Sequence, residues 1–364
     1  MNKPHSSKLH NLLDRRSTLI HVFFWGVLGV AFGAASNQWL AWTAAGLLAG
    51  ILTGGLTEIA LKKVRSSKKL YLRRILLFLL GETLLILLLV IPAYGAYTST
   101  HPLRLPVSIT PEQIQQEYQE LSLTNADGLQ IKGWYIPSKN GAAVITVHGY
   151  NGNRTHTIYH AQALAQAGYG VVLIDMHAHG ESEGQVFNDW ADDLDVLAAL
   201  DYLSTRPEVD PRRIGAAGLS SGAMASLYAA AKDQRLQAVW ADGTGMGRTE
   251  DALGPMLPEI RPFFFSTPLN WMYYQMIAAF CGVPPGPTIK ERLPLIRPRP
   301  VYFVAGGQDE IEAALAQRYA QVLGDSARLW IIADVGHIGG FLAHPEEYYG
   351  RMLEFFDQTI GAGS

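Results

Sequence analysis

The chain has 364 residues, enough for one large domain and a second, smaller part. Its formal net charge is −3, and all but three of its 32 acidic residues follow residue 97, so the larger part is acidic and disfavours nucleic acid as a partner. A single cysteine, Cys281, excludes an internal disulfide and a cysteine-rich metal site.

Three apolar runs dominate the first 97 residues and predict a membrane anchor of three transmembrane helices at about 18–35, 39–60 and 75–97. The second and third runs match the roughly 20 residues that cross a bilayer, and the first is near the lower limit. Buried core helices are the alternative, but three such runs ahead of the globular part argue against it. Glu82, inside the third run, is expected to snorkel or to pair with nearby arginines rather than to mark a transport path.

Basic residues set the predicted orientation of this anchor. They precede the first run and separate the second from the third, whereas the link at 36–38 carries no charge. The positive-inside rule places the basic segments in the cytoplasm. The chain is therefore expected to be a multi-pass protein of a bacterial inner or plasma membrane, with everything after residue 97 extracytoplasmic. A cleaved signal peptide ending near Ala35 is an alternative that leaves the last run pointing outward.

Residues 98–117 contain several prolines and are predicted to be a linker, after which strands and helices alternate. Two alternating stretches flank turn-forming residues at 125–128 and predict an antiparallel hairpin. Short apolar runs then predict buried strands, with helices between them. The fold class is therefore α/β, a doubly wound and mostly parallel sheet entered by a hairpin. The predicted strands are 118–124, 129–137, 142–147, 170–175, 213–217, 236–240, 301–305 and 328–332.

The pentapeptide Gly-Leu-Ser-Ser-Gly at 218–222 follows a predicted strand and opens a predicted helix. The G-x-S-x-G spacing suits a strained strand-to-helix corner, because the glycines carry no side chain to clash there. Backbone N–H groups at the start of the helix would face a developing oxyanion. Ser220 is the predicted nucleophile. The pentapeptide alone is a weak signal, since flexible loops are also rich in Gly and Ser.

Two residues after later strands complete the order Ser…Asp…His. His337 follows the last predicted strand, and imidazole titrates near neutrality, as a general base must. Asp309 follows the preceding strand and would fix the imidazole tautomer. Glu310 and Asp334 are neighbouring acids. Asp242, one strand earlier, is the more serious rival.

The loop at 148–154 follows a predicted strand, in the position where oxyanion donors are expected. The backbone N–H groups of Tyr150 and Ser221 are the predicted pair. His148 is expected to hold this loop rather than to act in catalysis.

His177 and His179 lie after another predicted strand, together with two acids. An H-x-H pattern without a third ligand at diagnostic spacing is weak evidence for a metal. No metal and no cofactor are predicted.

Together these motifs resemble an α/β-hydrolase over residues 118–361. The resemblance is to the dienelactone-hydrolase and prolyl-oligopeptidase-like branches and to hydrolases with an amino-terminal membrane span. It implies hydrolysis of an ester, thioester or amide through an acyl-enzyme. Ala223 and His177 depart from frequent residues of such relatives, but neither belongs to the triad. The motifs that carry the resemblance are the His148-Gly149 loop, the turn 175–182, the elbow 218–222, Asp309 and His337.

The segment at about 243–300 is predicted to be a lid, whose aromatic residues would line an acyl pocket or pack on the domain. An aromatic lid without a readable charged pocket favours an ester or thioester of a small-molecule or lipid-like acyl group. A serine peptidase of the prolyl-oligopeptidase-like type is the alternative. The alternative of another class is a non-catalytic membrane binding module on a hydrolase scaffold. The sequence sets no oligomeric state.

Overall fold

The computed structural model describes residues 19–27, 29–30, 39–62, 68–188, 190, 192–252 and 268–361. The chain divides into two compact units. The helical unit comprises Met1–Thr98 and Thr267–Pro284, and the sheet unit comprises Ser99–Ser266 and Pro285–Ser364. The predicted stretch 262–265 of the lid lies outside the described residues.

The sheet unit is built on eight strands in the order β1-β2-β4-β3-β5-β6-β7-β8. β1 pairs antiparallel with β2, and β2 pairs antiparallel with β4, whereas all other neighbours are parallel. The prediction of a mostly parallel sheet entered by an antiparallel hairpin is confirmed. The strands are β1 (Gln119–Thr124), β2 (Gln130–Ile136), β3 (Ala143–Val147), β4 (Gly170–Ile174), β5 (Ile214–Leu219), β6 (Leu236–Asp242), β7 (Val301–Gly306) and β8 (Ala327–Ile332).

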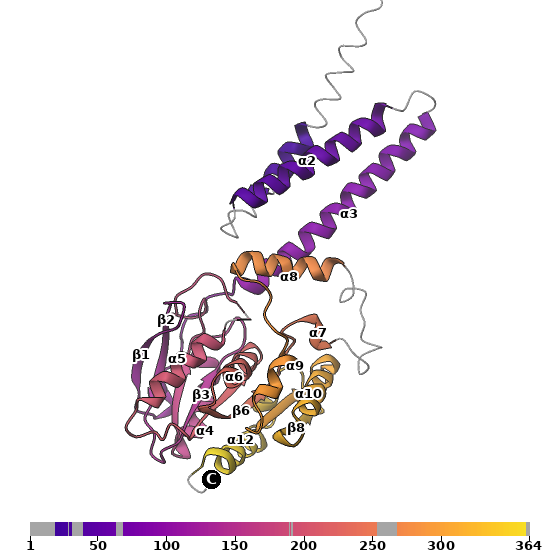
Figure 1. The fold of residues 1–364 in the computed structure, drawn as a ribbon. Helices are drawn as coiled ribbons and strands as arrows, with labels where there is room; N and C mark the ends of the chain where they lie inside the picture. The colour runs from indigo at the N-terminus through magenta and orange to yellow at the C-terminus, as the bar shows by residue number, and fades with distance from the viewer. Residues whose placement is uncertain are drawn as a thin grey trace, which may run out of the picture. The chain divides into compact units, whose positions relative to one another are not determined.

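Helices flank the sheet (Figure 1), so β3, β4 and β5 are buried along their whole lengths. The buried apolar residues form two clusters. One cluster includes side chains of α5, α6 and α10, namely Leu200, Leu227 and Tyr319. The other includes side chains of α4 and α12, namely Leu164 and Phe355. The α-helices of this unit are α4 (Ile158–Gln166), α5 (Asp193–Ser204), α6 (Ser221–Lys232), α7 (Thr249–Ala252), α9 (Ile289–Arg292), α10 (Glu310–Leu323), α11 (Gly340–Ala343) and α12 (Pro345–Ile360). Short 3-10 helices are η1 (Pro111–Ile114), η2 (Arg154–Thr157), η3 (Leu293–Leu295) and η4 (Gly324–Ser326).

The carboxyl ends of four parallel strands lie side by side. In the strand register Val147 pairs with Gly218, Leu219 pairs with Asp242, and Asp242 pairs with Val304. The loops that leave β3, β5, β6 and β7 therefore start at one edge of the sheet, which is where ligands bind in sheets of this kind.

In its described part, the helical unit contains a helix over 19–27, α2 (Trp39–Lys62), α3 (Lys68–Thr100) and α8 (Pro268–Cys281). α2 packs on the first helix through glycines, because a Cβ atom at Gly46 or Gly50 would collide with the backbone of Trp25 or Val22. These small residues thus allow a close approach of the two helices.

α8 comes from the middle of the predicted lid but packs on α3 of the helical unit. The rings of Tyr97 and Phe280 meet edge to face, 6.0 Å apart. A Cβ atom at Gly95 would lie 3.4 Å from the ring of Tyr273. Tyr273 and Phe280 of α8 therefore contact α3 within the helical unit.

Among the residues that the structure describes, no helix has both the length and the apolar character needed to cross a membrane. This finding contradicts the prediction of transmembrane helices at 39–60, at 75–97 and over the described part of 18–35, and with it the predicted extracytoplasmic location of the sheet unit. Residues 31–35 of the first predicted span lie outside the described residues. Hydropathy alone does not separate a bilayer crossing from helices that pack on one another. α3 also begins with two lysines and contains Pro92. The side chain of Glu82 lies outside the described part.

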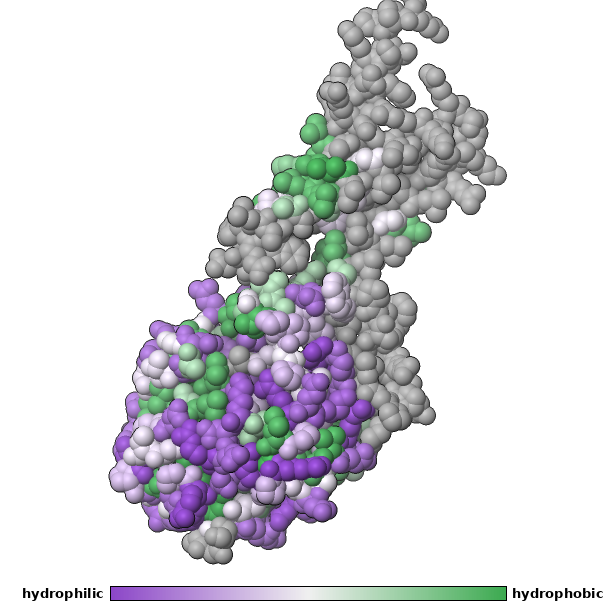
Figure 2. All heavy atoms as spheres, in the orientation of Figure 1, coloured by the Kyte–Doolittle hydropathy of each residue, from purple (hydrophilic) through white to green (hydrophobic). Residues whose placement is uncertain are grey.

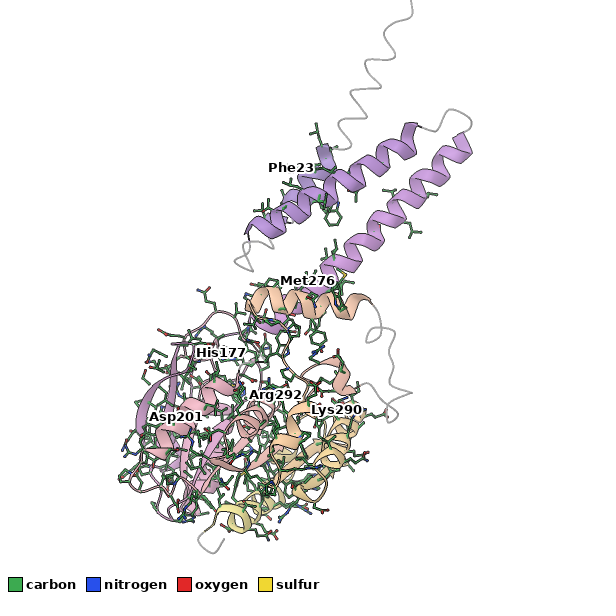
Figure 3. The ribbon with its side chains drawn as sticks, in the orientation of Figure 1. Phe23, His177, Asp201, Met276, Lys290 and Arg292 are labelled. Atoms are coloured by element: carbon green, nitrogen blue, oxygen red, sulfur yellow. The ribbon has the colours of Figure 1, made fainter. Side chains whose placement is uncertain are left out.

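The two units differ in surface character. Figure 2 shows mostly hydrophilic residues on the visible face of the sheet unit, and apolar residues gathered on the described part of the helical unit. Phe23, labelled in Figure 3, is 74% exposed, and Leu19, Leu48 and Ile51 are also more than half exposed. Apolar exposure is therefore concentrated on the helical unit.

Candidate active site

Ser220 stands at the corner between β5 and α6 with φ 55° and ψ −117°, in a region that non-glycine residues rarely adopt. The glycines around it are required sterically. A Cβ atom at Gly218 would collide with the backbone of Gly222, and one at Gly222 would collide with the carbonyl oxygens of Val147 and His148. The N–H of Ser220 donates to the carbonyl of Asp242 at 2.8 Å, which ties the corner to β6. The strained turn predicted from the pentapeptide is present.

His337 reaches the hydroxyl of Ser220 from the loop after β8. Its Nε2 lies 2.9 Å from Ser220 Oγ, and its Nδ1 contacts Glu312 Oε2. A carboxylate can only accept, so Nδ1 carries the proton and Nε2 is free to accept the hydrogen bond of the serine. The His337 side chain is 46% exposed, so a substrate can reach it. Serine and histidine therefore have the geometry of a nucleophile and its general base.

The acid beside His337 is Glu312, in the first turn of α10. Its side chain is only 5% exposed, and its second oxygen, Oε1, accepts the N–H of Gly306 at 2.7 Å. Both carboxylate oxygens are therefore held, one by the end of β7 and one by the imidazole.

The structure corrects the choice of Asp309 as the partner of His337. Asp309 is the N-cap of α10, and its Oδ1 accepts the N–H groups of Ile311 and Glu312 at 3.1 and 3.0 Å. A carboxylate at this position satisfies N–H groups that the helix leaves unpaired. Asp309 lies close enough to His337 to act on it through its charge, but its hydrogen bonds go to the helix.

The other acids that could have paired with His337, Asp334 and Asp242, form hydrogen bonds elsewhere. Asp334 pairs with His344 at 2.9 Å. Asp242 is fully buried and accepts the hydroxyl of Tyr348 at 2.8 Å, and Trp240 Nε1 donates to the same hydroxyl at 3.0 Å. Burial raises the pKa of Asp242 to about 7. This buried carboxyl therefore belongs to a network behind the site.

The hydrogen bond to Glu312 raises the pKa of His337 above its ordinary value, against the opposing effect of partial burial. The charges of Glu312, Asp242 and Asp309 act in the same direction. An imidazolium that forms when His337 takes a proton is thereby stabilised, as a general base in this position requires.

The loop after β3 lies against the serine. A Cβ atom at Gly149 would be 3.2 Å from Ser220 Cβ, so only a glycine allows this approach without strain. The carbonyl of Gly149 accepts the N–H of Gly152 at 3.0 Å and is 2.8 Å from His148 Nδ1. In a trans peptide the N–H points opposite to the carbonyl. The N–H of Tyr150 is therefore directed away from these two donors.

His148 holds this loop, as its sequence context suggests. Its Nε2 accepts the N–H of Met176 at 3.0 Å, so Nδ1 carries the proton and donates to Gly149. Burial lowers the pKa of His148 to about 4, which keeps the ring neutral near pH 7. Ser221, the other predicted oxyanion donor, is the first residue of α6, where backbone N–H groups have no partner within the helix.

His177 (Figure 3) and His179 use all four ring nitrogens within the protein. His177 Nδ1 pairs with Asp195 at 2.7 Å, and its Nε2 accepts the N–H of Asn188 at 3.0 Å. His179 Nδ1 lies 3.0 Å from the carbonyl of His177, and its Nε2 accepts the N–H of Asn151 at 3.3 Å. Neither ring is left to ligate a metal, and the described residues form no metal-binding cluster.

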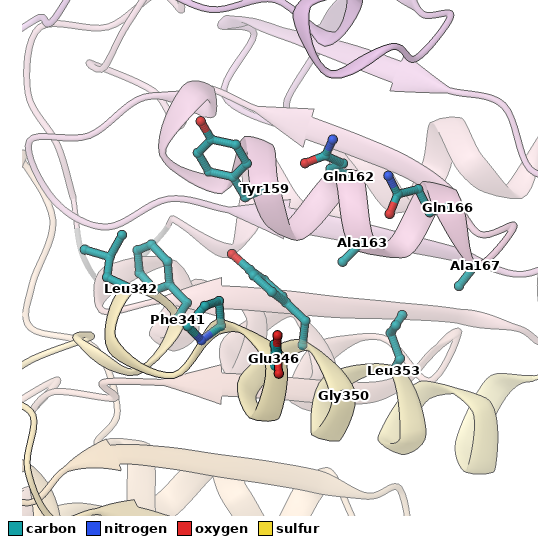
Figure 4. A pocket seen from close by; sticks show the side chains of 12 residues that line it. Tyr159, Gln162, Ala163, Gln166, Ala167, Phe341, Leu342, Glu346, Gly350 and Leu353 are labelled. Atoms are coloured by element: carbon teal, nitrogen blue, oxygen red, sulfur yellow. The ribbon is translucent and has the colours of Figure 1, made fainter.

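A groove of about 900 Å³ lies elsewhere on the sheet unit, between α4 and the segment of α11 and α12. Figure 4 shows Tyr159 of α4 across from Phe341 and Leu353. Ser220, Glu312 and His337 do not line it, so it is not the site described above.

Comparison with solved structures settles the fold. The sheet unit is similar to the esterase Pf2001 of Pyrococcus furiosus, with a TM-score of 0.59 and 23% identity, over 72% of this chain and 98% of that one. The chain has the α/β-hydrolase fold. Within this fold, residues 127–253 match the family model described as X-Pro dipeptidyl-peptidase (S15 family). That match includes Ser220 and ends before Glu312 and His337.

Curated proteins similar to this chain include two whose names refer to thioester or acyl chemistry. The thiohydrolase aneE of Aspergillus aculeatus is 29% identical over 136 residues, which are 36% of this chain and 43% of that protein. The polyketide transferase ATR5 of Stachybotrys chlorohalonatus is 34% identical over 128 residues, 33% of this chain and 42% of that protein. The chain thus matches less than half the length of these two relatives.

Proposed function

We propose that this chain is a serine hydrolase that cleaves an ester or thioester bond through an acyl-enzyme on Ser220. The observation that carries the proposal is the continuous path of hydrogen bonds from Ser220 Oγ through the imidazole of His337 to Glu312. A strained, partly exposed serine lies next to a partly exposed histidine, which is itself held by a buried carboxylate. Nucleophilic acyl transfer requires this arrangement.

In the first half of the reaction His337 Nε2 takes the proton of Ser220 Oγ while the oxygen attacks the substrate carbonyl carbon. Glu312 fixes the ring and stabilises the imidazolium without taking the proton. The backbone N–H groups of Tyr150 and Ser221 receive the oxyanion, and each such donor contributes roughly 2.7–4 kcal/mol to the transition state. The imidazolium then protonates the leaving alcohol or thiol, and the acyl group stays on Ser220.

In the second half His337 takes a proton from water, and the resulting hydroxide oxygen attacks the acyl carbon. The proton returns to Ser220 Oγ as the carboxylic acid leaves. The 46% exposure of the His337 side chain supports this half, since water has access to Nε2.

Esters and thioesters are favoured as substrates by the names of similar proteins, a thiohydrolase among the curated relatives and an esterase among the solved structures. The second candidate is a serine peptidase, favoured by the family model that matches residues 127–253. A non-catalytic binding module remains the competing class, although such a module has no need of the three-residue hydrogen-bond path.

The test is a panel of substrates with one wild-type preparation. We expect hydrolysis of acyl p-nitrophenyl esters and acyl thioesters, with a dependence of kcat/KM on acyl length, and loss of activity in Ser220→Ala. Turnover of X-Pro anilides but not of the esters would support the peptidase. No turnover of any substrate, together with no reaction of Ser220 with a fluorophosphonate, would support the binding module.

A further inference from the structure

Residues 100–106 begin at the last residue of α3 and form a strap that runs along the loops at the site within the sheet unit. The carbonyl of Thr100 accepts the N–H of Phe187 at 2.7 Å. The Leu103 side chain is 67% exposed, and Arg104, Leu105 and Pro106 are exposed as well. Polar contacts rather than burial of apolar side chains therefore hold the strap in place.

Arg104 anchors the middle of the strap to the turn after β4. Its guanidinium donates to three backbone carbonyls, those of Gly180 at 3.1 Å, Ser182 at 2.7 Å and Gly184. A planar guanidinium that satisfies three carbonyls fixes the strap in direction as well as in position.

Two asparagines in the loop after β3, one before and one after Gly152, form hydrogen bonds with the strap. Asn151 Oδ1 accepts the N–H of Leu103 at 2.8 Å. Asn153 Nδ2 donates to the carbonyls of Leu105 and Pro106, each at 3.1 Å. The N–H of Gly152, between these two contacts, is the group that donates to the carbonyl of Gly149.

The strap therefore acts on the peptide that joins Gly149 to Tyr150. The carbonyl of this peptide is held by the N–H of Gly152, and its N–H belongs to Tyr150, the proposed oxyanion donor. Asn151 has φ 57°, a left-handed conformation that asparagine tolerates better than most residues, and its N–H is tied to His179. The contact with Leu103 is what fixes its side chain.

We propose that residues 100–106 are a positioning element for oxyanion binding, and that the bond between the Leu103 N–H and Asn151 Oδ1 transmits their effect to the Gly149–Tyr150 peptide. The inference rests on the proposed hydrolase function. Asn151 and the strap are positioning residues, since they act through Tyr150 and do not touch the reacting atoms. A donor displaced from the oxyanion loses stabilisation in the transition state and leaves ground-state binding largely intact.

The experiment uses the 364-residue chain and two variants that delete the same hydrogen bond from opposite ends. Leu103→Pro removes the N–H, and Asn151→Gly removes the amide while allowing the left-handed backbone. We expect each to lower kcat by about 10- to 100-fold with KM changed less than about threefold, a part of the loss seen when an oxyanion donor is removed outright. The double variant should lose no more than either single one, because both delete one bond.

A matched variant separates this role from a general loss of folding. Leu103→Ala keeps the N–H and should therefore retain kcat near the wild-type value, with the thermal midpoints of all variants alike. Additive losses in the double variant, an effect on KM alone, or equal losses in Leu103→Ala would overturn the proposal. The wild type and Ser220→Ala, assayed in parallel, report on the proposed function itself: an inactive wild type defeats that function, whereas an active wild type with unaffected strap variants defeats only the positioning role.

Discussion

The carboxylate of Asp309 accepts the backbone N–H of Glu312 at 3.0 Å, and by doing so it caps the helix from whose first turn Glu312 reaches His337. The two acids are three residues apart and have different tasks. One satisfies backbone N–H groups at the start of α10, and the other holds the imidazole. A carboxylate in the first turn is also favoured by the helix dipole.

The division of labour between the two acids predicts opposite outcomes for two isosteric substitutions. Glu312→Gln should lower kcat by about 10³- to 10⁴-fold, because an amide that faces Nδ1 no longer enforces the tautomer or stabilises imidazolium. Asp309→Asn keeps a good N-cap residue and should leave kcat within about threefold of the wild type. Steady-state kinetics of both proteins decide the matter. A larger loss of kcat in Asp309→Asn than in Glu312→Gln would show that Asp309, not Glu312, is the acid that acts on His337.

The pH dependence of kcat/KM should change with Glu312 as well. The hydrogen bond to Glu312 raises the pKa of His337, and only the neutral ring can accept the Ser220 proton. Activity of the wild type should therefore fall as the pH drops through a value above the ordinary 6.5 of histidine. In Glu312→Gln the residual activity should persist to lower pH, because the pKa of His337 falls. If kcat/KM of Glu312→Gln falls at the same pH as that of the wild type, a group other than His337 controls the acidic side of the profile.

Asp242 predicts a dependence of stability on pH. Burial raises its pKa to about 7, whereas in the unfolded chain it ionises near pH 4. Between these values the folded protein binds a proton that the unfolded chain has released, so Asp242 makes the free energy of unfolding fall as pH rises through this window. Asp242→Asn cannot titrate and still offers an acceptor to Tyr348.

Urea unfolding of wild type and Asp242→Asn at pH 4.5, 6 and 8 measures this effect. The free energy of unfolding of the wild type, relative to the variant, should fall by on the order of 3 kcal/mol across the series. Equal changes in both proteins would show that Asp242 does not titrate in this window.

A pair of glycine substitutions tests the corner that holds Ser220. Gly222→Ala would drive a methyl group into the carbonyls of Val147 and His148, which should cost at least about 1–3 kcal/mol of stability and abolish activity. Gly350→Ala in α12 is the control, because a Cβ atom there meets nothing within 4 Å. It should stabilise the protein by about 0.5–1 kcal/mol, as expected for a helix interior. Thermal and urea unfolding compare the two, and an undamaged Gly222→Ala protein would contradict the steric account.

Much of the fold and of the site can be predicted from the sequence, because some positions there accept only one type of residue. The corner at Ser220 needs glycine at 218 and 222, since every other residue would place a Cβ atom inside backbone. The buried strands appear as continuous apolar runs because helices cover both faces of the sheet. His337 is recognisable by its place after the last strand.

Glu312 is harder to predict from the sequence. Asp309 follows a strand, as the acid of a triad would, but an acid at this position can equally be the N-cap of the next helix. The spacing of Asp309 and Glu312 is that of an acidic N-cap followed by a glutamate at the third helical position, and this spacing is the signal that separates the two roles. The apolar runs before residue 98 resemble transmembrane helices for a related reason, since hydropathy does not reveal the close helix packing at Gly46 and Gly50.

The most direct test of the account is covalent labelling with a fluorophosphonate, read by mass spectrometry of the digested protein. The probe should form one adduct, on Ser220, in the wild type. Ser220→Ala should carry none, and Glu312→Gln should react much more slowly than Asp309→Asn. Labelling that persists unchanged in Ser220→Ala, or a folded wild-type protein that takes no label, would contradict the assignment of Ser220 as the nucleophile.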